Sequence, residues 1–347
     1  MLKPKVSIII PHWNGVEVLS ECIASINNSL YKLFEIIVVD NKSTDGSQEW
    51  VKQNHPNITL LENDKNYGYA GGCNRGVSIA KGDYVVFLNN DTVQDSNWLE
   101  PLINLFEKDV KIAAVQPKIL NYYNKNTFDY AGACGGEMDI FCYPFARGRI
   151  FLEQEIDIGQ YEDSAECFWA SGAAFMIRKE VFLSAGKFES IFFSHMEEID
   201  LCWRLQAMGY KVFVEPNSII YHKNAISLPM GSQKKYYLNH RNSLIMLFSN
   251  YSLPLSFYIG ILRVILDFIA LFYSIIRLNF KQTSGIFLAL LWIISHPIPI
   301  FKKRYRFKKL KVNSDKKIMS RMFKKSIVLE HFLFKKNNYS DLSSKAD

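Results

Sequence analysis

Short apolar runs alternate with segments of helical spacing through the first 115 residues, and this alternation narrows the possible folds more than any other feature. Strands are predicted at 6–10, 34–39, 57–62, 83–88 and 111–115, and helices at 16–28, 70–81 and 98–106. The runs are apolar almost throughout, so each strand is expected to be buried on both faces of a sheet. The pattern predicts an α/β fold with a mostly parallel central sheet flanked by helices.

Polar residues gather where the predicted strands end. Pro11 to Gly15 follows the first strand, Asp40 and Asn41 close the second, and Asn89 to Asp91 follows the fourth. The carboxyl ends of parallel strands meet at one edge of a sheet, where α/β proteins bind ligands. Asp40 could accept hydrogen bonds from a base or ribose, and Asp91 could hold a hard divalent cation that also binds phosphates. Asp40 is equally typical of turns and helix caps. For Asp91 a functional role is favoured over an Asx turn, because a second polar strand end lies beside it in the predicted sheet.

Two later segments add candidate chemistry. A glycine-rich segment, 68–76, opens a predicted helix and suits the approach of an anion to the backbone, although it matches neither common nucleotide-binding fingerprint. Glu197, Glu198 and Asp200 open a predicted helix at 197–209. The helix dipole stabilises such charges, but adjacent carboxylates also raise each other's pKa, which suits one of them to act as a general base. His222, taken alone, is more typical of a buried structural histidine.

Taken in order, these motifs resemble the family 2 inverting glycosyltransferases, whose fold is GT-A. The resemblance covers about residues 5–245 and is nearest to rhamnosyltransferase-like enzymes of bacterial surface polysaccharide assembly. The matching segments are Pro11–Gly15, Ile37–Gly46, Asn66–Gly76, Leu88–Thr92, Trp169–Ala173, Gly186–Phe188, Glu197–Arg204, Gly209–Tyr210, Tyr221–His222 and Tyr236–Asn242.

The resemblance implies a role for each matched residue. Nucleotide and donor binding would involve Pro11, Asn14, Asp40, Asn41, Asn66, Gly68, Asn74 and Asn90, with Asp40 on the uracil or thymine face. Trp169, Ser171 and Gly172 would lie near the acceptor and the donor sugar. Asp91 and His222 would hold a divalent metal, Mg or Mn, although Asn89-Asn90-Asp91 offers only one carboxylate of the DxD-like motif. The catalytic group would be Glu198, Glu197 and Asp200, with Glu198 as the base by position, Glu197 as the alternative and Asp200 as support.

The implied activity is inverting transfer of a sugar from a dTDP- or UDP-linked donor to a glycan or lipid-linked glycan acceptor. Rhamnose is the expected sugar, with a UDP-hexose or UDP-HexNAc donor as the alternative. The chain lacks the QxxRW motif of processive synthases, so transfer of one or a very few sugars is expected. A non-catalytic nucleotide-binding or scaffold subunit of a glycan assembly complex is a further alternative. Two departures from the family pattern motivate it: Glu198 stands where many relatives have Asp, and Asp91 is the single carboxylate of its motif.

The C-terminal third changes character after a GT-A domain predicted at 1–245. Residues 246–301 are predicted to be an apolar helical, membrane-associating segment. Neither apolar stretch is a clean spanning helix, because 255–276 contains Arg263 and Asp267 and 286–301 contains two prolines. For 255–276, spanning remains possible.

A basic C-terminal tail is predicted at 302–347. Residues 302–336 hold fourteen Lys and Arg against two acidic residues, whereas the first 301 residues carry a net charge of −4. We expect 302–336 to bind an anionic membrane surface. Nucleic acid is not expected as a partner, because no zinc, helix-turn-helix or RNP pattern is present.

The cysteines and the start of the chain predict the compartment. Six cysteines show no CxxC pair and are expected to be reduced thiols. Residues 1–5 run directly into the first strand, so no signal peptide is expected. The predicted location is cytoplasmic, peripheral on the inner face of the cell membrane.

Overall fold

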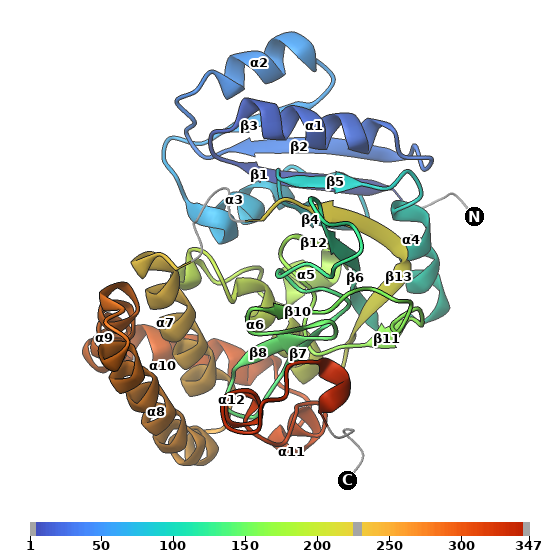
Figure 1. Cartoon of the computed structure of the whole chain (residues 1–347). Helices are drawn as coiled ribbons and strands as arrows, with labels where there is room; N and C mark the ends of the chain where they lie inside the picture. The colour runs from blue at the N-terminus through green and yellow to red at the C-terminus, as the bar shows by residue number, and fades with distance from the viewer. Residues whose placement is uncertain (1–4, 225–230, 343–347) are drawn as a thin grey trace.

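The computed structural model describes residues 5–224 and 231–342 (Figure 1). Residues 1–4, on which the expected absence of a signal peptide partly rests, and the last five residues of the predicted tail lie outside the described residues. None of the six cysteines forms a disulfide, and all six are buried.

The first half of the chain builds the parallel part of a nine-stranded sheet, in which β3, β2, β1 and β4 lie side by side. The elements are β1 (Val6–His12), α1 (Val16–Asn27), β2 (Phe34–Asp40), α2 (Ser47–Asn54), β3 (Thr59–Glu62), α3 (Gly68–Val77), β4 (Tyr84–Leu88), β5 (Thr92–Gln94) and α4 (Leu99–Lys108). Every predicted strand and helix of this half is present. Helix α2 is an addition, because its one buried apolar residue, Val51, gives no helical periodicity in the sequence.

The second half completes the sheet with strands of both directions. It contributes β6 (Ile112–Asn121), β11 (Ala165–Glu166), β12 (Ala174–Arg178) and β13 (Lys211–His222), joined by α5 (Lys179–Ser184), the short 3-10 helix η1 (Ser190–Phe192) and α6 (Glu197–Ala207). Strand β12 lies antiparallel between β4 and β6, and β13 lies parallel to β6. The predicted α/β class is confirmed, with a sheet that is mixed in direction.

The run of apolar and small residues at 167–178 predicts a strand throughout, but β12 begins only at Ala174. Residues before it follow the small neighbouring sheet instead: the main chain of Trp169 and Gly136 exchanges hydrogen bonds of 3.0 and 3.1 Å. Local hydrophobicity is the same in both arrangements, so sequence pattern alone did not separate them.

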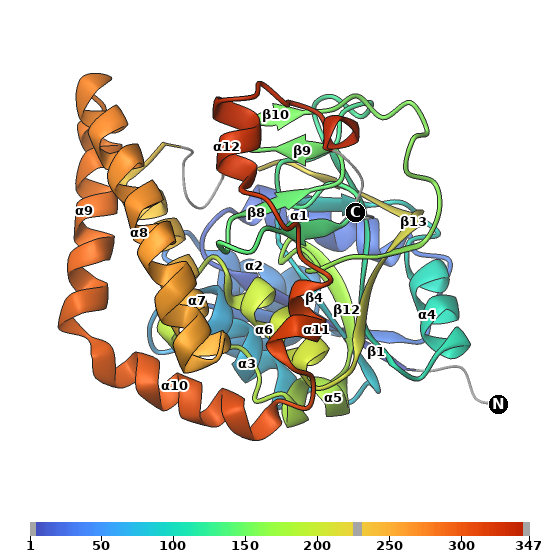
Figure 2. The same ribbon diagram turned by 90° about the horizontal axis from the view of Figure 1, so that it is seen from below.

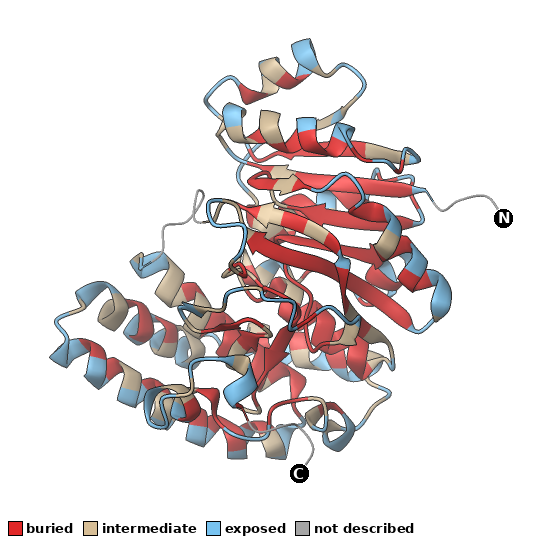
Figure 3. Ribbon diagram, turned by 45° about the vertical axis from the view of Figure 1, so that its right-hand side comes forward, coloured by how far each residue is buried: buried red, intermediate tan, exposed pale blue. Residues whose placement is uncertain are grey.

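Alternating side chains of the central strands divide the core into two layers. Val6, Ile8 and Ile10 of β1 pack with α1 and α4 on one face, whereas Ile9 packs with α3 and α6 on the other. This division follows from the two-residue period of a strand, and it explains why the strands are apolar at nearly every position. Figure 3 shows the resulting buried band through the sheet.

The glycines and aromatic residues of 121–166 predict an irregular, loop-rich region, and in the structure this region contains a small four-stranded antiparallel sheet. Its strands are β7 (Gly136–Met138), β8 (Pro144–Ala146), β9 (Arg149–Ile150) and β10 (Glu153–Gln154). The C-terminal segment packs on this sheet: Phe323 N–H donates to Met138 O at 2.9 Å, and Ile140 N–H donates to Phe323 O at 3.1 Å. Within its described part, the predicted basic tail is therefore folded against the domain.

The C-terminal helices surround one side of the domain (Figure 2). They are α7 (Gln233–Asn250), α8 (Leu253–Ile276), α9 (Phe280–Ser295), α10 (Pro297–Leu310), α11 (Asp315–Met319) and α12 (Ile327–Phe332), followed by the 3-10 helix η2 (Tyr339–Asp341). Helix α7 packs against α8, α9 and α10, and α10 also reaches α6. The predicted divisions at 245/246 and 301/302 fall inside α7 and α10, and the apolar stretch 286–301 breaks at His296.

In the described part of the chain, α8 is the one helix with the length and composition to cross a membrane. Helices α9 and α10 would add a second crossing only as one broken span, and they are bent by 73°.

Candidate active site

A buried histidine joins the ends of two central strands. The β1–β2 register places His12 level with Asp40. His12 Nδ1 lies 2.9 Å from Asn90 Nδ2, and its Nε2 lies 2.8 Å from Ser47 Oγ. An amide nitrogen can only donate, so Nδ1 accepts and Nε2–H donates to Ser47. Burial lowers the pKa of His12, against the opposing charges of Asp40 and Asp45. His12 is thus a neutral histidine that links Asn90 to Ser47 at this edge of the sheet.

Asp40 presents an acceptor that the protein does not use. Its Oδ2 accepts from the Ser43 amide at 2.9 Å and from Gln48 Nε2 at 2.5 Å. Its Oδ1 is buried without a hydrogen-bond partner. An unpaired buried acceptor costs about 1–3 kcal/mol, a cost that a ligand N–H would remove. This geometry suits the predicted contact with a nucleobase.

The other predicted donor residues at these strand ends mostly organise the loops. Pro11 lies in β1 level with Val39. Asn14 accepts from the Thr44 amide at 2.9 Å, which ties the first loop to the second. Asn41 accepts from Asn63 Nδ2 at 2.9 Å.

The loop before α3 is also shaped by internal contacts. Asn66 Oδ1 accepts from the Gly68 amide at 2.8 Å. Gly68 has φ +70°, and a Cβ there would stand 2.3 Å from Phe193 O, so only glycine fits. The Asn74 amide bonds the main chain of Phe188 at 2.8 and 3.0 Å, which ties α3 to the segment before η1. These two bonds use one of its two N–H donors and one of its two acceptor positions, so its role in nucleotide binding stays a prediction.

Asp91 and His222 meet across neighbouring strands. Strand β13 pairs with β5 so that His222 lies opposite Thr92, beside Asp91. His222 Nε2 lies 3.1 Å from Asp91 Oδ1, and its Nδ1 lies 2.9 Å from Asp129 Oδ1. Burial opposes a charged imidazole, but the two carboxylates raise the pKa of His222 well above its usual value. Burial likewise opposes ionisation of Asp91, yet the charge of His222 holds the pKa of Asp91 below its usual value.

This pair would hold a divalent cation once His222 gives up its Nε2 proton, because a charged imidazole cannot act as a ligand. Asp129 anchors the Nδ1 side of His222, an arrangement typical of metal-binding histidines, and leaves Nε2 turned to Asp91. Residues 5–224 and 231–342 contain no group of three convergent His, Cys, Asp or Glu side chains. Two protein ligands are nevertheless typical where substrate phosphates complete the coordination, as in many Mg²⁺ sites.

Two adjacent carboxyl groups lie at the start of α6. Glu197 and Glu198 each have a buried Oε2 without a hydrogen-bond partner. Burial raises the pKa of Glu198 to about 7, and burial together with the charge of Glu198 raises the pKa of Glu197 well above its usual value. A Cβ on Gly172 would stand 3.5 Å from Glu198 Oε1, so the backbone there approaches the carboxyl group closely. Tyr69 Oη donates to Gly172 O at 2.6 Å from the other side.

Helix α7 holds the loop that delivers these carboxyl groups. Phe193, His195 and Met196 all have positive φ, a conformation that non-glycine residues rarely adopt. Asn242 Nδ2 reaches the carbonyl oxygens of Phe192, Ser194 and His195 at 3.1, 2.9 and 2.7 Å. These bonds compensate for local strain next to the candidate base.

Three other predicted site residues lie within the protein interior. Trp169 is 4% exposed, and its indole donates to Glu137 O at 2.7 Å. Ser171 is 2% exposed and its hydroxyl donates to Ala131 O. Asp200 is fully buried and is paired with Arg204 and Lys303 at 2.9 and 2.6 Å. Of the predicted sugar-contacting residues, Gly172 alone lies beside Glu198, and Asp200 is a structural anchor.

The sequence patterns missed His12, Tyr69 and Asp129. His12 lies in the segment 11–15 after the first predicted strand, where nucleotide binding was assigned to Pro11 and Asn14 instead. Asp129 comes from the irregular region 121–166, where no spacing signals a contact with His222 almost a hundred residues later.

Comparison with known proteins agrees with this geometry. The Glycosyl transferase family 2 model matches residues 7–183. The O-antigen biosynthesis protein RfbC of Myxococcus xanthus is 29% identical over 233 residues, which are 64% of this chain but 18% of that protein. The N-acetylglucosaminyl-diphospho-decaprenol L-rhamnosyltransferase of Mycobacterium tuberculosis is 22% identical over 248 residues, covering 67% of this chain and 81% of the relative.

A structure of GalNAc-T7 with UDP, GalNAc and Mn²⁺ superposes with a TM-score of 0.62 at 17% identity, covering 92% of this chain and 56% of that one. This likeness concerns the fold. The family match extends over half of the chain and includes the strand ends that carry His12, Asp40 and Asp91. The chain belongs to glycosyl transferase family 2 and has the GT-A fold.

Proposed function

We propose that the protein is an inverting glycosyltransferase that moves a sugar from a nucleotide-diphosphate donor to a glycan hydroxyl. The observation that carries this proposal is Glu198, a carboxyl group with an unpartnered oxygen and a pKa raised to about 7 by burial. A general base works best when its pKa lies near the working pH. The charge of an ionised Glu198 raises the pKa of the neighbouring Glu197, in addition to burial, so Glu197 would stay protonated beside it.

The residues divide the reaction between them. Asp40 Oδ1 would accept from the nucleobase, and Asp91 with His222 would hold a divalent cation. When bound, that cation supplies Lewis-acid stabilisation of the departing diphosphate. Glu198 would take the proton of the acceptor hydroxyl as its oxygen attacks the anomeric carbon, with the nucleoside diphosphate leaving from the opposite face. One displacement inverts the anomeric configuration.

For the substrates, we propose a dTDP- or UDP-linked donor carrying rhamnose and a lipid-linked or cell-envelope glycan acceptor. Support comes from the activity for which the mycobacterial relative at 22% identity is named, and from the O-antigen biosynthesis for which RfbC is named. A UDP-hexose or UDP-HexNAc donor uses the same site chemistry.

A donor panel tests this function. Protein with Mn²⁺ is mixed with UDP-, dTDP- and GDP-sugars, and the melting temperature and slow donor hydrolysis are recorded. We expect a metal-dependent rise in melting temperature with one uridine or thymidine sugar, because folded protein alone binds it. Asp91→Asn should remove the metal dependence, whereas Asp95→Asn, an exposed carboxylate four residues on, should keep it. A well-folded protein that responds to no nucleotide sugar contradicts the proposal.

We also propose that the protein binds an anionic membrane surface peripherally, at the cytoplasmic face. The support is the distribution of residues on α8, in which the two charged residues are buried and many apolar residues are exposed. Arg263 and Asp267 are 1% and 0% exposed and form an ion pair at 3.2 Å. The outward side of α8 is lined by exposed apolar residues: Phe257, Tyr258, Ile261, Leu262, Ile265, Phe268, Ile269, Phe272, Tyr273 and Ile276. A helix facing water has the opposite arrangement.

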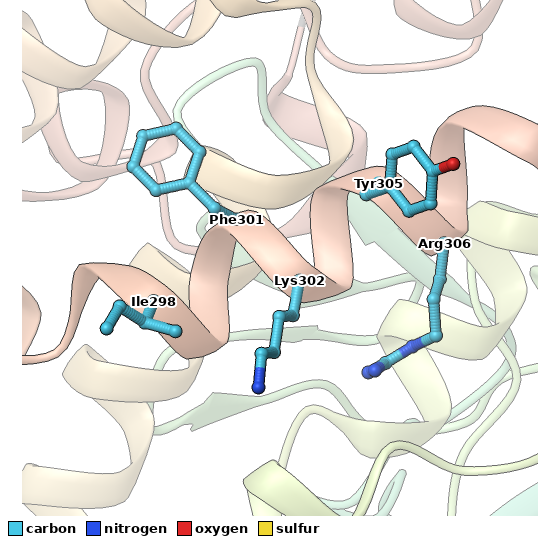
Figure 4. Close-up of a pocket in the computed structure, with 5 residues that line it drawn as sticks. All are labelled: Ile298, Phe301, Lys302, Tyr305 and Arg306. Carbon is cyan, nitrogen blue, oxygen red and sulfur yellow. The ribbon is translucent and has the colours of Figure 1, made fainter.

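Basic residues flank this apolar face. Arg277 and Lys281 lie exposed at the turn between α8 and α9. On α10, Phe301 and Tyr305 project from one side and Lys302 and Arg306 from the other, around a shallow surface hollow (Figure 4). Exposed apolar and aromatic side chains beside Lys and Arg are typical of surfaces that bind anionic lipids.

Vesicle sedimentation tests the membrane proposal. Binding to vesicles with anionic phosphatidylglycerol should exceed binding to neutral phosphatidylcholine vesicles and should weaken with salt. The double variant Phe268→Asp/Phe272→Asp should lose most binding. Ile158→Asp should not, because Ile158 is an apolar residue that is 83% exposed but lies in a loop outside α8. Equal binding of the double variant and the parent protein would place the contact elsewhere.

A further inference from the structure

An arginine of the small sheet lies buried near the active site with an unused donor. Arg149 in β9 is 6% exposed, and its Nη1 donates to Phe151 O at 3.2 Å. Its Nε is buried without a hydrogen-bond partner. A guanidinium keeps its charge when buried, so an unpaired Nε–H is costly unless an acceptor fills the place.

A second cation shares the same surroundings. The Arg149 guanidinium carbon and Lys235 Nζ lie 4.9 and 5.1 Å from the centre of the Tyr130 ring. Burial and the charge of Arg149 lower the pKa of Lys235 to about 8, against the charge of Asp129. The charge of Lys235 is also felt by His195, beside the Glu197–Glu198 pair. The charge of Lys235 thus interacts both with Asp129, which bonds the metal-binding candidate His222, and with the segment that precedes the candidate base.

Asp129 does not neutralise both cations. One of its oxygens bonds His222 Nδ1, and the other accepts from Asn224. It is the carboxylate whose charge acts on both Arg149 and Lys235. Two cations beside one committed carboxylate leave a net positive charge, which favours an anion with several acceptor oxygens.

The cluster is distinct from the predicted position of the donor diphosphate. A metal-bound diphosphate belongs at the Nε2 edge of His222, where Asp91 lies, whereas Asp129 occupies the Nδ1 edge. Arg149 comes from β9, outside the parallel half of the sheet that carries Asp40. An anion at Arg149 would therefore lie on the Asp129 side of His222, and the nucleotide on its Asp91 side.

We propose that Arg149, Lys235 and Tyr130 form a subsite for a phosphate group on the acceptor. This inference rests on the proposed glycosyl transfer and narrows the acceptor to a phosphorylated glycan or glycolipid. The phosphate would accept from Arg149 Nε–H and from the Lys235 ammonium. Binding there would hold the acceptor hydroxyl next to Glu198.

Phenyl phosphate, a soluble monoester, tests the subsite in calorimetric titrations of the full chain. Titrations are made without nucleotide and again with saturating UDP and Mg²⁺. We expect the same Kd in both, at least a 10-fold higher Kd in Arg149→Gln, a smaller rise in Lys235→Gln, and recovery in Arg149→Lys. Lys234→Gln is the matched control, because this neighbouring lysine is exposed. If Arg149→Gln fails to fold, Lys235→Gln carries the test.

Four results would overturn the proposal. Competitive displacement of phenyl phosphate by UDP would show that the cations bind the donor diphosphate. Unchanged affinity in folded Arg149→Gln and Lys235→Gln would show that they bind no phosphate. A protein that binds phenyl phosphate but no nucleotide would contradict the proposed function, and with it the acceptor assignment, whereas nucleotide binding without phosphate binding would overturn the subsite alone.

Discussion

Replacing Glu198 with Gln is expected to lower kcat by about 10²- to 10⁴-fold, the usual contribution of a general base. The amide keeps the size of the side chain but cannot take the acceptor proton. Donor binding should persist, because Asp40 and the Asp91–His222 pair are untouched. Steady-state kinetics with the donor identified in the panel, together with UDP titration, would separate these effects.

The pH dependence identifies which of the two carboxyl groups is the base. Burial raises the pKa of Glu198 to about 7, and the base must be ionised to act. Activity should therefore rise with pH and level off above about 7. Glu197→Gln should keep this profile, because burial and the charge of an ionised Glu198 both raise the pKa of Glu197 and so favour its protonated form. If Glu197→Gln is inactive while Glu198→Gln retains activity, the two roles are reversed.

Glu198→Gln should also stabilise the fold at alkaline pH. A carboxyl group whose native pKa is raised binds more protons folded than unfolded between about pH 4.5 and 7. The parent protein should lose stability as pH rises through this window, by up to about 3 kcal/mol at 1.36 kcal/mol for each pKa unit. The variant lacks that loss, so urea unfolding should show a gain at pH 8 that disappears near pH 4. A gain that does not vary with pH would contradict the raised pKa.

The strand ends were predictable because they depend on local patterns. An apolar run fixes a buried strand, a polar residue at its end fixes the ligand edge, and parallel order brings Asp40, Asn90 and Asp91 to one edge. The order of motifs then supplied His222 and the Glu197–Glu198 pair. In the structure, Asp40, Glu197 and Glu198 each have a buried oxygen without a hydrogen-bond partner. Asp91 and His222 contact each other.

The remaining assignments depended on contacts that sequence spacing does not encode. Asn74, Trp169 and Ser171 lie in matched motifs, but their polar groups bond main-chain atoms of distant segments. Arg149 and Asp129 lie in the irregular region, where no period places a side chain. A motif therefore marks residues near a site without separating those that face the ligand from those that hold the loops.

The C-terminal basic segment gives the clearest difference between composition and structure. Its charge predicted a tail that binds an anionic partner. Lys303, however, is 1% exposed and contacts α6, the helix that carries the candidate base. Lys303 Nζ bonds Asp200 Oδ1 at 2.6 Å, Asn250 Oδ1 at 2.7 Å and Ser249 Oγ at 3.0 Å. Asp200 stands two residues after Glu198 in α6, so the C-terminal helices and the candidate base share one buried network.

Lys303→Met is therefore expected to destabilise the protein by about 3–5 kcal/mol, the usual cost of removing one partner from a buried ion pair. Methionine fills the space but leaves the charge of Asp200 paired with Arg204 alone. Urea unfolding followed by circular dichroism measures the change in free energy. Lys302→Met is the matched control, since Lys302 is the exposed neighbour on the same turn, and it should change stability by less than about 0.5 kcal/mol.

The double variant Lys303→Met/Asp200→Asn distinguishes a lost charge pair from lost packing. If Lys303 and Asp200 interact as charges, the double variant should be destabilised by less than the sum of the two single effects, because the same interaction is removed only once. Arg204 loses its carboxylate in both variants that replace Asp200, so this loss cancels in the comparison. Lost packing would instead make the two effects add. Equal stability of Lys303→Met and Lys302→Met would show that the basic segment is not joined to α6 through Lys303, and the C-terminal helices would then be free to act as the separate module that composition predicts.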